Sequence, residues 1–229
     1  MNIKPWQEFR EENDFLSGDI QIWSASLEAE DCSLFIHLLS EDEKNRAAQL
    51  KSSAAACQQI ISRGILRLLL GNYTGLNPKE LVFDNSPFGK PFLRNPANSE
   101  IYFNLAHSAN MLLFAFGKGK HVGIDVEKIE EKINFKVISP LVFTYKEQLS
   151  LSRSMDPIHD FYVLWTAKEA ILKVSGRGFS YPVNQFSVVI SKGMPCLPLI
   201  SEELTGGCSC SLSSFSPANG YSAAIAVLQ

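Results

Sequence analysis

The chain has 229 residues, of which 45% are hydrophobic and 20% are charged. This composition is typical of a globular protein and excludes a disordered chain, a collagen-like repeat and a coiled coil. The 21 basic and 24 acidic residues leave a net charge of −3, which argues against a protein that binds nucleic acid through its overall field.

The first 14 residues are polar and charged, so they lack the apolar segment of a signal peptide. No uncharged apolar run reaches the roughly 18 residues that a membrane span needs. Among the five cysteines only Cys208 and Cys210 are close in sequence, and no His or Cys pair completes a zinc site with them. We predict a cytoplasmic protein with no membrane partner and with reduced thiols; a metal on Cys208 and Cys210 is the less favoured alternative.

The first half of the chain is predicted to mix strands and helices. Ser40 and Glu43 have the spacing of a capping box, which opens a helix. Apolar residues then recur at helical spacing, with Arg63 and Arg67 off the apolar stripe. The expected elements are a strand over 19–27, a helix over 31–39, a helix from 41, a helix over 57–70 ended by Gly71-Asn72, a turn-rich loop over 84–91, and buried strands over 101–105 and 111–116.

The second half repeats this mixture of strands and helices. Its expected elements are a strand over 121–126 in a hairpin with 111–116 through residues 117–120, helices that begin at Ser139-Pro140 and Asp156-Pro157, the second running over 157–175 up to Gly176, and strands over 185–190 and 221–228. We therefore predict an α+β protein with two lobes, residues 1–116 and 117–229, joined near residues 117–120.

Two acidic residues lie close together in the strand predicted over 121–126 and just beyond it. Residues two apart in a strand point to the same side, so Asp125 and Glu127 present their carboxylates together, while Ile124 and Val126 point into a core. Such carboxylates repel each other unless one is protonated or a cation lies between them, and oxygen ligands favour Mg²⁺. The alternative for this pattern taken alone is an exposed polar strand face.

A second charged pair lies on the helix predicted over 157–175. Glu169 is at the edge of the apolar stripe, and Lys173 follows one turn later. The pair could be an ordinary salt bridge within the helix, worth roughly 0.2–0.5 kcal/mol. A carboxylate at the edge of the stripe can also reach a cleft beside the core.

A histidine stands just after the buried strand predicted over 101–105. His107 taken alone is interpreted as a hydrogen-bonded structural residue. A Ser-His-acid triad is disfavoured because Ser108 is adjacent to His107 and no nucleophile elbow surrounds it.

Taken together, three motifs in this order are far more specific than any one of them. They are Asn-x-Ala-His-Ser at 104–108, Gly-Ile-Asp-Val-Glu at 123–127 and Trp-x-x-Lys-Glu-Ala-x-x-Lys at 165–173. In this combination the chain resembles the 4′-phosphopantetheinyl transferases of the surfactin-synthetase-activator type. Gly89-Lys90-Pro91 and the segment 176–180 also match, and the resemblance covers about residues 40–189.

The resemblance implies a fold of two similar lobes of antiparallel strands packed with helices and related by a pseudo-two-fold axis, in a monomer. It also implies an enzyme that transfers the 4′-phosphopantetheine arm of coenzyme A to a serine of an acyl, polyketide or peptidyl carrier protein and releases 3′,5′-ADP. Asp125, Glu127 and Glu169 would hold Mg²⁺ against the pyrophosphate. Glu169 is the expected base for the carrier serine, directly or through water, and Glu127 is the alternative.

The remaining site residues also follow from the resemblance. Lys173 would bind the phosphates and favour departure of the nucleotide, and Lys90, His107 and Ser108 match positions at the nucleotide. Lys44, Arg46 or Lys51 is expected at the 3′-phosphate of coenzyme A. Many relatives carry an arginine near Gln58 and Gln59 that is missing here, so the resemblance leaves the details of the 3′-phosphate site open.

Two other functions stay open beside the transferase. A pseudoenzyme that only binds carrier proteins should lack one of the three carboxylates, and this chain has all three. An unrelated Mg²⁺-dependent phosphodiesterase would share the acidic ligands but would not need Lys173 one turn from Glu169. On the transferase reading, the net charge of −3 averages an acidic metal site and a basic phosphate site.

Overall fold

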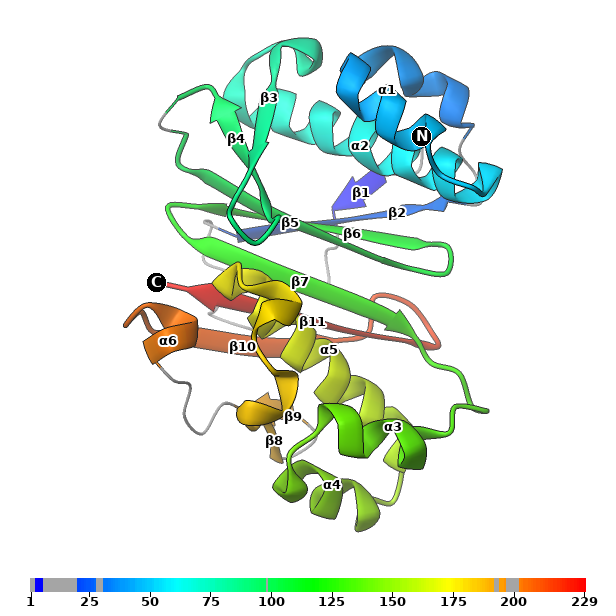
Figure 1. Cartoon of the computed structure of the whole chain (residues 1–229), viewed down its shortest axis with the longest axis vertical. Helices are drawn as coiled ribbons and strands as arrows, with labels where there is room; N and C mark the ends of the chain where they lie inside the picture. Colours follow the sequence, from blue (N-terminus) through cyan, green and yellow to red (C-terminus); the bar gives the residue numbers. More distant parts are fainter. Residues whose placement is uncertain (1–2, 6–19, 28–30, 98, 192–193, 197–201) are drawn as a thin grey trace.

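A four-stranded and a three-stranded antiparallel sheet lie face to face, and a long helix covers the outer face of each (Figure 1). The computed structural model describes residues 3–5, 20–27, 31–97, 99–191, 194–196 and 202–229. Most of the polar segment 1–14 lies outside these residues, so its interpretation stays a prediction. Of the helices in the described ranges, none combines the length and the hydrophobicity that a bilayer crossing requires.

The strands follow the alternation of apolar and polar residues in the sequence. The larger sheet has the order β1-β2-β6-β5, from Ile3–Pro5, Ile20–Ser26, Met111–Lys118 and Ile101–Ser108. The smaller sheet has the order β10-β11-β7, from Cys210–Phe215, Tyr221–Leu228 and His121–Lys128. Two further hairpins are β3–β4, Val82–Asn85 with Pro91–Asn95, and β8–β9, Val189–Ser191 with Met194–Cys196.

Two of the helices begin at polar caps that the sequence predicts. Ser40 and Glu43 form the predicted capping box of α1, and the side chain of Asp156 accepts a hydrogen bond from the backbone of His159 at the start of α5. The helices are α1 Glu41–Ala48, α2 Ser53–Thr74, α3 Phe135–Val142, α4 Tyr145–Ser152, α5 Pro157–Ser175 and α6 Glu202–Thr205.

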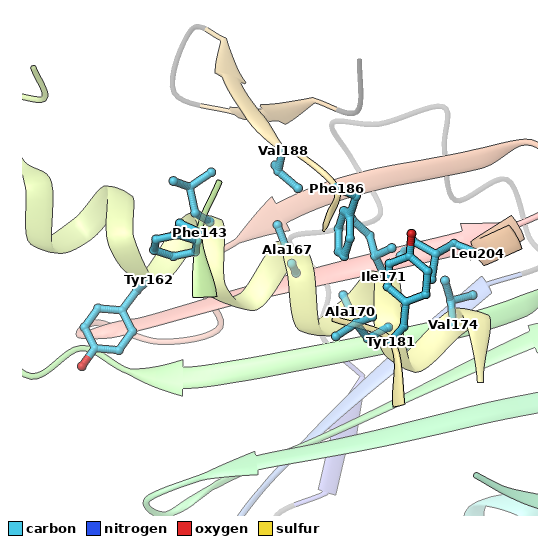
Figure 2. Packing of buried hydrophobic residues seen from close by; sticks show 14 of the residues in the cluster. Phe143, Tyr162, Ala167, Ala170, Ile171, Val174, Tyr181, Phe186, Val188 and Leu204 are labelled. Atoms are coloured by element: carbon cyan, nitrogen blue, oxygen red, sulfur yellow. The ribbon is translucent and has the colours of Figure 1, made fainter. Parts of the chain in front are cut away.

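Three apolar clusters hold these layers together. One lies between α2 and the larger sheet, and one lies between the two sheets, where Ile22 and Leu113 meet Ile124 and Ile225. The third lies around α5 and the outer face of the smaller sheet; Figure 2 shows part of it, including Phe186. Both sheets thus bury both faces.

Several sequence expectations are confirmed. The strand near Ile20, the strands that became β5, β6 and β11, and the helix over 157–175 with its end at Gly176 all form. The α+β class is confirmed as well. Cys208 and Cys210 are both free of disulfide bonds, and the choice between reduced thiols and a metal on them stays a prediction.

The expected hairpin between 111–116 and 121–126 is wrong. Strands β6 and β7 follow each other through a tight turn, but β6 pairs with β2 and β5, whereas β7 pairs with β11 in the other sheet. The chain passes from one sheet into the next in a tight turn that begins at Gly117. A Cβ atom at Gly117 would lie 2.3 Å from the carbonyl oxygen of Lys120, so this turn requires a glycine.

Four helix and strand boundaries also differ from expectation. Residues 31–39 form two short 3₁₀ turns instead of a helix. Helix α2 continues through Gly71 and ends only at Gly75, which has the left-handed conformation of a helix C-cap. Pro140 lies inside α3 instead of opening a helix, and the strand expected over 185–190 is limited to β8 and follows a 3₁₀ turn.

Candidate active site on strand β7 and helix α5

A glycine on β7 allows helix α5 to lie directly on the strand. A Cβ atom at Gly123 would be 2.2 Å from the carbonyl oxygen of Ala170 and 2.3 Å from the backbone nitrogen of Val174. Residues 123, 125 and 127 share this side of the strand, so Asp125 and Glu127 face the helix side, while Ile124 and Val126 pack between the sheets. The predicted orientation of the two carboxylates is confirmed, and the exposed polar face is excluded for Asp125.

Asp125 and Lys173 form an ion pair between the strand and the helix. Lys173 Nζ donates to Asp125 Oδ1 at 2.7 Å and to the carbonyl oxygen of Ile124 at 3.1 Å. Asp125 is only 6% exposed, and burial raises its pKa to about 6, with Lys173 acting in the opposite direction and Glu127 raising it further. Lys173 therefore pairs with Asp125 on the strand, and not with Glu169 on its own helix.

Glu169 is the second buried carboxylate of the site. It is 7% exposed, and burial together with the charges of Asp125 and Glu127 raises its pKa to about 7, against the lowering effect of Lys173. Glu169 Oε1 and Asp125 Oδ2 are buried and have no hydrogen-bond partner among the residues that the structure describes. Two such oxygens close enough to repel each other need a proton or a cation.

The larger sheet supplies polar residues to the same place. Ser108 Oγ on β5 donates to Glu127 Oε2 at 2.7 Å and accepts from the backbone nitrogen of Lys128 at 3.0 Å. His107 is exposed beside this pair. Partial burial and the positive charge of Lys173 lower its pKa, and Glu127 acts in the opposite direction. The structure therefore gathers the residues His107, Ser108, Asp125, Glu127, Glu169 and Lys173.

Lys90 approaches the site from the β3–β4 hairpin. Its ammonium donates to the carbonyl oxygens of Val122 at 3.0 Å and Lys173 at 2.7 Å, so it ties the hairpin to the last turn of α5. Burial lowers the pKa of Lys90 to about 8. Lys90 also lines a cavity of about 440 Å³ between the hairpin, the start of β5 and the end of α5. Its expected contact with phosphate stays a prediction.

The three candidates for the 3′-phosphate lie on or after α1. Lys44 Nζ is paired with Glu41 at 2.8 Å, and Lys51 is exposed. Arg46 lines a second cavity, of about 230 Å³, which is bounded by α1, α2 and the β3–β4 hairpin. The structure thus sets these residues apart from the carboxylates.

The donor set fits a hard cation, although it is not assembled as a cage. In the described parts of the chain, no three His, Cys, Asp or Glu side chains are gathered as a metal centre. The two unpartnered oxygens of Asp125 and Glu169, with Glu127 beside them, nevertheless offer the oxygen-only ligands that Mg²⁺ prefers. Lys173 occupies the other oxygen of Asp125.

Sequence reasoning missed a buried ion pair behind the site. Lys168 Nζ donates to both carboxylate oxygens of Glu147 at 2.7 and 2.8 Å and to the carbonyl oxygen of Phe186 at 2.7 Å. Glu147 also accepts from the backbone nitrogens of Thr144 and Val188. The sequence signal for Glu147 is its capping-box position, three residues after Thr144. Lys168 lies within the motif at 165–173, but the sequence assigns it no role.

Comparisons with known proteins show the family of the chain. A family model described as the 4′-phosphopantetheinyl transferase superfamily matches residues 121–226, and one described as 4′-phosphopantetheinyl transferase, N-terminal, matches residues 21–117. The 4′-phosphopantetheinyl transferase HetI of Nostoc sp. is 32% identical over 170 residues, which cover 72% of each chain. The chain belongs to the 4′-phosphopantetheinyl transferase family.

Other relatives carry the same family name. The 4′-phosphopantetheinyl transferase Sfp of Bacillus subtilis is 25% identical over 163 residues, covering 71% of each chain. Among solved structures, holo-[acyl-carrier-protein] synthase of Thermotoga maritima is 20% identical with a TM-score of 0.41, covering 48% of this chain and 62% of that chain. The family membership makes the chain a transferase enzyme of the surfactin-synthetase-activator type, as its motifs indicated.

Proposed function

We propose that this phosphopantetheinyl transferase takes coenzyme A as donor and a serine of an apo acyl, polyketide or peptidyl carrier protein as acceptor. The serine oxygen forms a bond to the phosphorus that bears the pantetheine, the pyrophosphate P–O bond breaks, and 3′,5′-ADP leaves with the bonding electrons. The observation that carries the proposal is the pair of buried, unpartnered oxygens on Asp125 and Glu169 beside Lys173.

Asp125, Glu127 and Glu169 are the residues that would hold Mg²⁺. When bound, the ion offsets charge on the pyrophosphate and on the departing nucleotide. Lys173 adds a fixed positive charge at the same point because Asp125 and the carbonyl oxygen of Ile124 anchor its ammonium.

Glu169 is the residue best suited to accept the serine proton. A general base works best when its pKa is near the working pH, and burial raises the pKa of Glu169 to about 7. Glu127 is more exposed and is engaged by Ser108, which favours an orienting role over proton transfer.

The cavity of about 440 Å³ is proposed to take the nucleoside part of coenzyme A. Its volume suits a small ligand, and Phe88, Tyr102 and His121 supply aromatic walls. Lys90 stands between this cavity and Lys173, which is where the pyrophosphate would pass. His107 stays proposed as a phosphate contact from the other end of β5.

The carrier protein is proposed to approach over α3 and α4. Helix α3 begins eight residues after Glu127, and Val137, Leu141 and Tyr145 are 64%, 70% and 78% exposed. Lys136 and Lys146 accompany them in the sequence and suit the acidic surface of a carrier protein.

Transfer can be tested by the mass of the acceptor. We expect an apo carrier protein incubated with the enzyme, coenzyme A and Mg²⁺ to become heavier by one phosphopantetheine arm. Asp125→Asn should abolish the shift while keeping the circular dichroism spectrum. An unshifted carrier with the unmodified enzyme would point to the pseudoenzyme, and cleavage of coenzyme A without transfer would point to a phosphodiesterase.

Three further assignments remain proposals. Monomeric state and cytoplasmic location rest on the sequence alone. The division into lobes at 1–116 and 117–229 is supported by the two family models, which match on either side of residues 117–121, and by the change of sheet at that point.

A further inference from the structure

A fully buried ion pair lies beside the candidate active site, between α4 and α5. The side chains of Lys168 and Glu147 are 0% and 1% exposed. The ammonium of Lys168 has three N–H donors, and all three have acceptors: the two carboxylate oxygens of Glu147 and the carbonyl oxygen of Phe186. No donor is left for a substrate phosphate, so a role of Lys168 in the reaction must act through other residues.

The pair joins three segments that are separated in the sequence. One oxygen of Glu147 accepts from the backbone nitrogen of Val188 at 2.8 Å, and the other accepts from the backbone nitrogen of Thr144 at 2.7 Å. The rings of Phe143 and Phe186 flank the ammonium, with centroids 5.7 and 4.7 Å from Nζ. The start of α4, the segment before β8 and helix α5 are thus fixed to one another by directional bonds.

A buried pair of this kind sets a position more than it adds stability. The free-energy cost of removing two charges from water largely cancels their attraction, so an apolar pair of similar volume often stabilises a protein equally well. An apolar pair can slide and rotate, however, whereas three N–H···O bonds define one place for Lys168. The place of Lys168 in turn defines how α5 is rotated about its axis.

Glu169 depends on this rotation more than the other two carboxylates of the site. Lys173 holds Asp125 at 2.7 Å, and Ser108 holds Glu127 at 2.7 Å. No hydrogen bond from the described residues reaches the carboxylate of Glu169, and its Oε1 is buried. The position of this carboxylate is therefore set by the helix that carries it.

Contacts with two different elements hold α5 in place. Toward β7, the close approach at Gly123 limits how near the helix lies, and the long side chain of Lys173 joins the helix to the strand. Toward α4, the buried pair anchors Lys168. Consecutive residues of a helix are about 100° apart, so Lys168 and Glu169 point in different directions. The pair can thus fix the rotation of α5 without occupying the site.

We propose that the Glu147–Lys168 pair positions Glu169 for cation binding and proton transfer, which makes Lys168 a positioning residue of the reaction. The proposal rests on the proposed function. In a chain without the pair, α5 keeps its apolar contacts but is free to turn, and Glu169 is no longer held beside Asp125. The result is a weaker cation site and a slower reaction in a protein that is still folded.

The test separates position from stability by comparing four proteins. They are the unmodified protein, Lys168→Met, the double variant Glu147→Leu/Lys168→Met and the control Leu70→Ala. The double variant replaces both charges by apolar groups and should regain most of the stability that Lys168→Met loses. Leu70 is a fully buried residue of α2 in the cluster between α2 and the larger sheet, so its truncation lowers stability without touching α5.

Three measurements are made on each protein: stability by chemical denaturation, Mn²⁺ affinity by titration calorimetry, and kcat by the mass of the carrier. We expect both variants of the pair to bind Mn²⁺ about 10- to 100-fold more weakly and to lose kcat by a similar factor. Leu70→Ala should match the unmodified protein in Mn²⁺ affinity and kcat. The double variant decides the question even where Lys168→Met does not fold.

Recovery of Mn²⁺ affinity and kcat together with stability in the double variant would overturn the positioning role. Equal losses of Mn²⁺ affinity in Leu70→Ala and in the variants of the pair would overturn it as well. An unmodified protein that binds Mn²⁺ but transfers nothing to the carrier would count against the proposed function, while the Mn²⁺ affinities of the variants would still decide the role of the pair.

Discussion

Ser108 on β5 donates a hydrogen bond to Glu127 on β7 at 2.7 Å, across the junction of the two sheets. Four residues earlier on β5, Asn104 Oδ1 accepts from the backbone nitrogen of Ile124 at 2.8 Å. One strand of the larger sheet thus fixes both the backbone and one carboxylate of the strand that carries the site. Ser108 orients Glu127, and its expected contact with the nucleotide stays a prediction.

Removal of this hydroxyl should weaken cation binding. Outer hydrogen bonds of this kind change metal affinity by about 10- to 100-fold, so we expect Ser108→Ala to bind Mn²⁺, used as a probe for Mg²⁺, that much more weakly. Ser108→Thr keeps the hydroxyl and should bind nearly as the unmodified protein. Calorimetric titration of the three proteins measures the effect, and equal affinities for Ser108→Ala and the unmodified protein would contradict it.

The buried carboxylates predict a pH dependence with a definite sign. Because burial raises the pKa of Asp125 to about 6 and of Glu169 to about 7, protons compete with the cation below neutral pH. We expect affinity for Mg²⁺ to fall as the pH is lowered from 8 to 6, by up to about tenfold per pH unit for each group below its pKa. Calorimetry at several pH values measures it.

The same two groups act on stability in the absence of metal. Their ordinary pKa values are about 3.9 and 4.3, so between pH 4 and 7 the folded chain holds more protons than the unfolded chain. Their contribution to the free energy of unfolding therefore decreases as the pH rises through this window. Urea unfolding at pH 5 and 8 should show a smaller decrease for Asp125→Asn than for the unmodified protein.

The close approach of α5 to β7 should not tolerate even one methyl group. In Gly123→Ala, the new Cβ would collide with backbone atoms of Ala170 and Val174, so the helix must move away from the strand. We expect a loss of about 1–3 kcal/mol in the free energy of unfolding and a large loss of transfer, because Lys173 moves from Asp125. Urea unfolding and the carrier mass assay measure the two effects, and full activity would show that the contact is not critical.

The buried pair behind the site should matter for stability. Lys168→Met leaves the carboxylate of Glu147 buried without its cation, which typically costs about 3–5 kcal/mol. Chemical denaturation measures the loss. Lys146→Met removes an exposed lysine of the neighbouring helix and should change stability by less than about 0.5 kcal/mol. Similar values for the two variants would argue against the pair.

Local signals predicted most of the elements that carry the site. The cap at Asp156, the stop at Gly176 and the alternation around Ile124 depend on neighbouring residues only, and all three appear in the structure. The sharing of one strand face by Asp125 and Glu127 follows from strand geometry. Membership of the family was likewise readable, because three ordered motifs are specific.

What the sequence could not show depends on contacts between distant segments. Strands β6 and β7 are adjacent in sequence, which predicted a hairpin. In the structure β6 pairs with β2 and β5, and β7 pairs with β11. Arg67 looked like a surface residue because its partners, Glu43 and the carbonyl oxygens of residues 78 and 81, come from other elements.

The apolar cluster between the two sheets has a consequence for dissecting the molecule. This cluster joins Ile22, Leu113 and Ala115 of one sheet to Ile124 and Val227 of the other. A chain cut in the turn after β6 would therefore leave each fragment with an exposed apolar sheet face. Such pieces should aggregate when made separately and recombine when made together. Fragment complementation, with transfer restored only in the mixture, is thus a natural experiment for this fold, since Ser108 and Glu127 reach the site from opposite pieces.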